Sequence, residues 1–196
     1  MSKKPARNRT NLHPTQLQSP ETLSPAELAV RRAQAEAERQ RQGRALLIEG
    51  TRLLNSGEAG EATALLQEAV RLLPDDPNAA INLGGAYILQ RQHNKAVQVL
   101  EAAKERHPDH VMMWVNLAAA YLGSLEISGP QQQARAIEAF ERALALDATT
   151  PHVHYNLGLI HHDRGELDQA RRYFQLALEA NPADSDAQQW LSRLNH

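Results

Sequence analysis

Residues 77–110 read PNAAINLGGAYILQRQHNKAVQVLEAAKERHPDH, and the pattern of this stretch predicts the fold of the chain. The same kinds of residue return near every 34th position from Gly43 onward, including two alanines and a closing proline. The recurring residues are Ala62, Ala96, Ala136 and Ala170, then Ala69, Ala103, Ala143 and Ala177, then Pro74, Pro108 and Pro182. A fixed period of this length indicates stacked helical hairpins. Because such arrays present an elongated surface, the period also limits the kinds of function that we expect of the protein.

Four copies of the pattern divide the chain. We expect hairpin units at 43–76, 77–110, 111–150 and 151–184, each with two amphipathic helices that flank a turn. Each unit ends at a turn, usually with proline, because proline cannot continue a helix. A last helix at 185–196 has no partner helix, and we expect it to cap the open end of the stack with Leu191 and Leu194. The predicted fold is therefore an all-α solenoid.

The third unit is six residues longer than the others. Its extra length lies in Gly123–Pro130, between the two helices of one hairpin. Insertions at exposed turns cost little closure entropy, so a tolerated surface loop is one interpretation. The other interpretation is a contact with a partner, with Leu125 and Ile127 as its apolar tip.

The chain before the repeats has two segments of different composition. Residues 1–23 contain three prolines and almost no apolar side chains, so they cannot bury enough surface to offset ordering entropy. We expect a disordered, basic tail there. Ser24-Pro25-Ala26-Glu27 forms a capping box with proline at the first helical position, and strong helix formers follow. We therefore expect an exposed helix over 24–42 that leads into the array.

The composition excludes several classes of function. The chain has no cysteine, which excludes disulfides, thiol catalysis and zinc–thiolate sites. Its net charge of −2 divides into +4 for residues 1–42, which hold eight basic and four acidic residues, and −6 for the remainder. An acidic array is a poor general binder of nucleic acid. No apolar run approaches the roughly 18 residues of a membrane helix, and the N-terminus lacks the apolar core of a secretory signal, so we expect a soluble cytoplasmic protein.

The array resembles the tetratricopeptide repeat family, in which each unit is a helix A–turn–helix B hairpin with preferred residues at eight places. In units one and two the resembling residues are Leu46, Glu49, Gly50, Leu53, Ala62, Leu66, Ala69 and Pro74, then Ala80, Leu83, Gly84, Tyr87, Ala96, Leu100, Ala103 and Pro108. In units three and four they are Trp114, Leu117, Ala118, Tyr121, Ala136, Phe140, Ala143 and Ala148, then His154, Leu157, Gly158, His161, Ala170, Phe174, Ala177 and Pro182. The resemblance covers residues 43–184 and implies a right-handed α-solenoid of four hairpins.

The resemblance also implies a binding groove, because the A helices of this family line a concave surface that holds extended peptides or a partner's helix. The sixth place of helix A is occupied by Asn82, Asn116 and Asn156 in the last three units. An asparagine amide offers both a donor and an acceptor, so it can pair with a peptide unit. This arrangement resembles the asparagine ladder of some superhelical members. The same amides could instead hydrogen-bond between adjacent repeats, and both interpretations are open.

The other predicted groove residues are mostly apolar. They are Ile81, Val115, Tyr155, Ile88, Leu122, Met112 and His152. A groove lined in this way should prefer an apolar or amphipathic segment. Members of the family that bind chaperones hold an acidic C-terminus in a carboxylate clamp, but Leu47 or Ile81 stands here where the clamp has its first lysine. We therefore expect no chaperone tail bound by a carboxylate clamp.

No catalytic, cofactor or metal site is predicted. The sequence has no Gly-rich phosphate loop and no nucleophile elbow. Histidines gather in the fourth unit, but His154 and His161 stand seven residues apart and no carboxylate completes a metal-binding spacing. We expect a non-catalytic adaptor or scaffold whose partner is a protein or peptide. Two alternatives stay open: a structural or oligomerisation subunit, joined through the helix from Ser24 or the repeat edges, and an RNA-binding helical repeat.

Overall fold

A computed structural model describes residues 23–194 of the chain. The predicted disordered tail lies outside this range except for Leu23, as do the last two residues of the predicted capping helix. Between residues 23 and 194 the structure contains α-helices, one short 3-10 helix and no strand. No helix in this range is both long enough and apolar enough to cross a membrane. The chain divides into two compact parts, residues 1–38 and 39–196, which are described separately.

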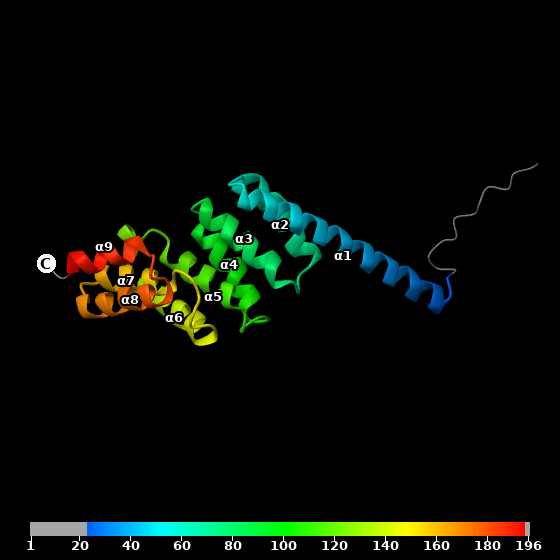
Figure 1. Ribbon diagram of the computed structural model, residues 1–196. Coiled ribbons are helices and arrows are strands. Elements are labelled where there is room, and N and C mark those ends of the chain that lie inside the picture. Colours follow the sequence, from blue (N-terminus) through cyan, green and yellow to red (C-terminus); the bar gives the residue numbers. More distant parts are fainter. Residues whose placement is uncertain (1–22, 195–196) are drawn as a thin grey trace, which may run out of the picture. The chain divides into compact units, whose positions relative to one another are not determined.

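The helices of the described chain confirm the predicted all-α class (Figure 1). They are α1 (Pro25–Asn55), α2 (Ala59–Leu72), α3 (Pro77–Leu89), α4 (His93–Lys104), α5 (Val111–Leu122), η2 (Leu125–Ile127), α6 (Pro130–Leu146), α7 (Val153–Asp163), α8 (Leu167–Ala180) and α9 (Ser185–Leu194). Helix α1 is thus a single helix of 31 residues that continues from the segment before the repeats into the first hairpin.

The described portion of the first part is the beginning of α1. The Ser24 backbone N–H donates to Glu27 Oε2 at 2.9 Å, and the Glu27 N–H donates to Ser24 Oγ at 3.3 Å. This reciprocal pair is the predicted capping box, and its hydrogen bonds lower the pKa of the Glu27 carboxyl. From Ser24 to Glu38 every side chain except that of Leu28 is exposed.

The second part is a right-handed α-solenoid in which each helix packs against the next. Helices α3 and α4, α5 and α6, and α7 and α8 form hairpins, and α9 packs against α8 (Figure 1). Small residues allow the two helices of a hairpin to approach closely. A Cβ atom on Gly84 would lie 2.7 Å from Leu100 Cδ2, and one on Gly158 would lie 2.6 Å from Phe174 Cε1. The spacing of Gly or Ala against Leu or Phe therefore fixes the hairpin geometry.

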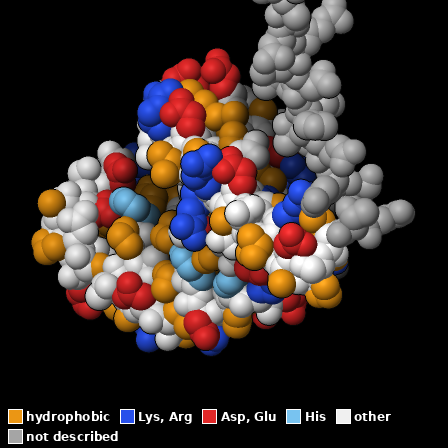
Figure 2. All heavy atoms as spheres, turned by 90° about the vertical axis from the view of Figure 1, so that its right-hand side faces the viewer, with side chains coloured by type: hydrophobic (Ala, Val, Ile, Leu, Met, Phe, Trp, Pro, Cys, Tyr) orange, Lys and Arg blue, Asp and Glu red, His pale blue; other side chains and the backbone are white. Residues whose placement is uncertain are grey.

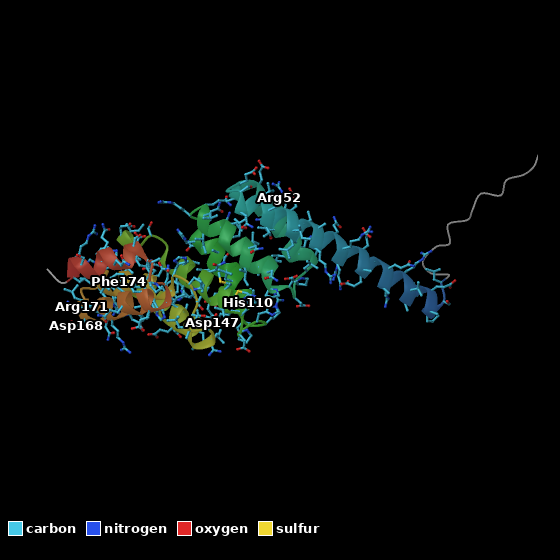
Figure 3. The ribbon with its side chains drawn as sticks, in the orientation of Figure 1. Arg52, His110, Asp147, Asp168, Arg171 and Phe174 are labelled. Atoms are coloured by element: carbon cyan, nitrogen blue, oxygen red, sulfur yellow. The ribbon has the colours of Figure 1, made fainter. Side chains whose placement is uncertain are left out.

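Helix α9 covers the end of the last hairpin. Ala187 is fully buried there, and the Trp190 ring stacks on the Phe174 ring with centroids 5.8 Å apart. The Arg171 guanidinium on α8 pairs with Asp168 at 3.0 Å and donates to the Leu194 carbonyl at 3.1 Å, so it joins the end of α9 to α8. Figure 3 shows Arg171 and Asp168 together beside this end of the array. The polar side chains of α9 face solvent, as a cap requires.

The insertion in the third unit forms a structured loop. Helix α5 ends at Gly123, whose φ of +62° favours glycine, and the short helix η2 precedes Pro130 at the start of α6. The Gln133 side chain, only 4% exposed, donates to Asp163 Oδ2 on α7 at 2.7 Å and to Ser128 Oγ at 3.3 Å. These hydrogen bonds attach the loop to the next hairpin.

Candidate partner-binding surface

The A helices of the last three units carry almost no charge. Helices α3 and α5 contain no Lys, Arg, Asp or Glu, and α7 contains only Asp163, its last residue. The B helices α2, α4, α6 and α8 each carry both acidic and basic residues. In the last three units the Lys, Arg, Asp and Glu residues of the helices therefore lie on the B helices apart from Asp163, and the predicted groove wall there is neutral and largely apolar.

The three ladder asparagines have different surroundings. Asn82 Nδ2 donates to Thr51 Oγ1 at 2.7 Å, and Asn116 Nδ2 donates to the Ile81 carbonyl at 3.1 Å. Each of these bonds reaches back to the preceding repeat. The side-chain amide of Asn156 makes no hydrogen bond to any other residue of the described chain, although the helix around it is regular. The side-chain amides of Asn82 and Asn116 thus join successive repeats, whereas that of Asn156 has no hydrogen-bond partner among the described residues.

The remaining predicted groove residues differ in exposure. Met112 is 44% exposed and His152 is also exposed, whereas four others are half-buried. The half-buried ones are Val115, Tyr155, Ile88 and Leu122. Ile81 is only 6% exposed and belongs to the core around Leu83 and Leu100, so the prediction that its side chain lines an open groove is wrong. Its contribution to this wall is the backbone carbonyl that accepts from Asn116.

Two separate hollows receive some of these residues. His152 and Tyr155 lie together in a pocket of about 280 Å³ near the start of α7, which Thr150, Ala177 and Asp184 also line. Leu122 lines a different pocket, of about 540 Å³, beside the insertion of the third unit. The sequence predicts that these residues line one groove. In the structure they line two separate pockets.

Two contributors to this surface come from the first hairpin. Thr51 is the partner of Asn82, and its hydroxyl also donates to the Leu47 carbonyl at 2.7 Å. Ile48 occupies the sixth place of unit one, where later units have asparagine, and its side chain is 71% exposed. The contacts thus show that Thr51 is a hydrogen-bonding partner of the second unit, whereas Ile48 exposes an apolar side chain.

The histidines of the fourth unit pack against aromatic rings. His161 stacks on Tyr173 with centroids 5.1 Å apart, and His162 lies 4.5 Å from the Trp190 ring. His161 Nδ1 also lies 2.5 Å from Glu166 Oε2. Hydrogen bonds from His161 and then from Arg164 lower the pKa of the Glu166 carboxyl, whereas burial raises the pKa of Tyr173. Between residues 23 and 194 no three His, Asp or Glu side chains form a metal-binding group.

The chain is similar to several proteins that contain helical repeats. It is 26% identical over 121 residues to anaphase-promoting complex subunit 3 of Schizosaccharomyces pombe, covering 62% of this chain and 17% of that protein. It is 26% identical over 123 residues to the peroxisomal targeting signal receptor of Kluyveromyces lactis, covering 63% of this chain and 21% of that protein. The chain thus spans about a fifth of the length of these curated relatives.

The fold is also found among solved structures. A thermophilic tetratricopeptide repeat protein of Thermus thermophilus superimposes with a TM-score of 0.66 at 20% identity, covering 78% of this chain and 80% of that one. Two family models, both described as tetratricopeptide repeat, match residues 53–122 and 132–185, which together make up more than half of the chain. The chain therefore belongs to the tetratricopeptide repeat family.

Proposed function

We propose that this chain is a non-catalytic protein-interaction scaffold that binds an apolar or amphipathic segment of a partner along α3, α5 and α7. The observation that carries the proposal is the absence of Lys, Arg, Asp and Glu from these helices as far as Asp163. A neutral wall favours an apolar segment, because a charged one would lose hydration there without gaining a partner. An RNA backbone would require a basic wall.

The side-chain amide of Asn156 supports contact with a peptide backbone. It offers a donor and an acceptor, and no residue of the described chain uses either. Met112 on α5 and His152, which precedes α7, expose their side chains and would contact the partner's side chains. Asn82 and Asn116, by contrast, are proposed to hold successive repeats in register.

The comparisons support a binding function without naming a partner. By name, one relative is a subunit of a complex and the other is a receptor for a targeting signal. On the face drawn in Figure 2, hydrophobic, basic and acidic side chains are interspersed, and no patch of one charge covers it. The absence of a chaperone carboxylate clamp and the cytoplasmic location stay predictions.

An affinity-capture experiment tests the proposal. The full chain is immobilised as the wild type, as Asn156→Ala and as Gln175→Ala, which removes an exposed amide from α8. Proteins retained from a cell extract are quantified by mass spectrometry. We expect the wild type and Gln175→Ala to retain the same proteins and Asn156→Ala to lose most of them. If Asn156→Ala retains the same proteins in the same amounts, the proposal that Asn156 contacts a partner's backbone is wrong.

A second candidate is self-association through the helix before the repeats. Val30 is 55% exposed on α1, and it lines, with Leu23 and Ala26, a shallow hollow of about 420 Å³. An exposed apolar strip on a helix is a typical contact surface between copies. Light scattering of the full chain and of Val30→Glu separates the candidates. A mass that rises with concentration in the wild type and not in the variant would support the oligomerisation subunit.

A further inference from the structure

The insertion of the third unit borders the pocket of about 540 Å³, which we name the loop pocket. Its walls come from the first turns of α4, the end of α5, the inserted loop and the start of α6. Pockets that hold ligands commonly measure about 300–1,000 Å³, so the loop pocket has room for a bulky side chain and the peptide atoms beside it. Among its lining residues only Leu122 is also a predicted groove residue.

The loop pocket is shaped before any ligand arrives. Gly123, at φ +62°, lies against the His93 ring, where an added Cβ would stand 3.5 Å from His93 Cδ2. Ser128 Oγ donates to the Leu125 carbonyl at 3.0 Å, and the buried Gln133 amide bonds both to Ser128 and to Asp163 on α7. Because these bonds fix the loop, binding would require little further ordering of the protein.

The lining of the loop pocket favours an uncharged ligand. Val97, Ala120 and Leu122 supply apolar surface, and Asn94 and Gln98 are neutral amides. The one Lys, Arg, Asp or Glu in the lining is Arg135, whose guanidinium lies 3.8 Å from the centre of the Tyr121 ring and 3.2 Å from Glu101 Oε1. With that cation already paired and stacked, an incoming carboxylate would have to compete with Glu101 for it.

One apolar side chain at the loop pocket is left uncovered by the rest of the described chain. Ile127 is 85% exposed, more than any other large hydrophobic residue of the described chain, and its side chain lies at the rim. An apolar side chain in the pocket would cover Ile127 and remove its exposed surface from water.

We propose that the loop pocket is a second binding site, separate from the groove, that takes one leucine or aromatic side chain from an uncharged segment of a partner protein. Ile127 packs against that side chain at the rim of the pocket. A scaffold with two such sites holds a partner that reaches both of them more tightly than either site alone, because the second contact becomes intramolecular.

Titration of the full chain with blocked amino acids, followed by amide NMR, tests the proposal. The probes are N-acetyl-phenylalanine amide and N-acetyl-leucine amide, compared with N-acetyl-lysine amide and with N-acetyl-glutamate amide, whose side chain is a carboxylate. We expect the first two to shift the amide signals of Gly123, Ser124 and Ile127, and the charged probes to shift them at least roughly tenfold more weakly. No shift from the apolar probes, or equal shifts from a charged probe, would overturn the proposal.

Three variants assign the site. Ile127→Ser removes the rim, and Asn94→Trp places a ring in the pocket from an exposed position on α4. Leu167→Ser is the matched control, since Leu167 is an exposed leucine (47%) outside the pocket. We expect the first two to weaken probe binding by roughly threefold or more and the control to leave it unchanged. Equal affinity in Ile127→Ser, Asn94→Trp and the control would show that the probes bind elsewhere.

Discussion

The hydrogen bonds of the asparagine ladder predict an order of stability among three alanine variants. Asn116→Ala removes the 3.1 Å bond to the Ile81 carbonyl, which is worth about 1 kcal/mol. The same change replaces asparagine by the best helix former and returns up to about 0.7 kcal/mol. The net loss is therefore about 0.5 kcal/mol.

Asn156→Ala gains the same helix propensity and loses no hydrogen bond to the described chain, so it should stabilise the protein by about 0.5 kcal/mol. Asn82→Ala should resemble Asn116→Ala, because it removes the 2.7 Å bond to Thr51 while the Thr51 hydroxyl keeps its bond to Leu47. The difference between positions 116 and 156 is about 1 kcal/mol, or about 2–4 °C in Tm for a chain of this size.

Urea and thermal unfolding of the three variants, followed by circular dichroism, measure this order. An Asn156→Ala protein that is destabilised as much as Asn116→Ala would refute the assignment of the 156 amide to a partner, because the amide would then be structural. An Asn116→Ala protein more stable than the wild type would show that the bond to Ile81 contributes nothing. If Asn156→Ala is as stable as expected, its effect in affinity capture reports binding alone.

Three further predictions concern the last hairpin and the first. Gly158→Ala should destabilise the protein by about 1–2 kcal/mol, because the new methyl group would stand 2.6 Å from a Phe174 ring carbon and overpacking outweighs the gain in helix propensity. Gly60→Ala on α2 should be neutral or slightly stabilising, because nothing lies within 4 Å of the added methyl group. Urea unfolding measures the stability of both glycine variants. The pKa of the Glu166 carboxyl is lowered, mainly by its hydrogen bond with His161. The ionised carboxylate therefore stabilises the fold fully above the ordinary glutamate pKa, and this stabilisation is lost as the pH falls through the lowered pKa. Tm measured from neutral to acidic pH should therefore fall less steeply in Glu166→Gln, and an unchanged slope would show that this contact is unimportant.

Much of the fold follows from the sequence because it depends on local, repeated features. Proline ends the helices, and the recurring Ala69, Ala103, Ala143 and Ala177 allow close helix contacts wherever they occur. The capping box at Ser24 is local in the same sense, and the structure contains its hydrogen bonds. Ile81 shows the limit of this reasoning, because a place in the repeat does not reveal how much of the side chain the neighbouring repeats cover.

The sequence by itself therefore determined the solenoid, the neutral wall of α3, α5 and α7 and the positions of the three asparagines, since each depends only on residue type and on the 34-residue register. The tertiary structure decided which of those asparagines are already bonded, that Gln133 attaches the inserted loop to α7, and that His93 and Ile127 meet at one pocket. These are contacts between residues about 30 or more positions apart, and they depend on the distances between packed helices, which the pattern within one repeat does not contain.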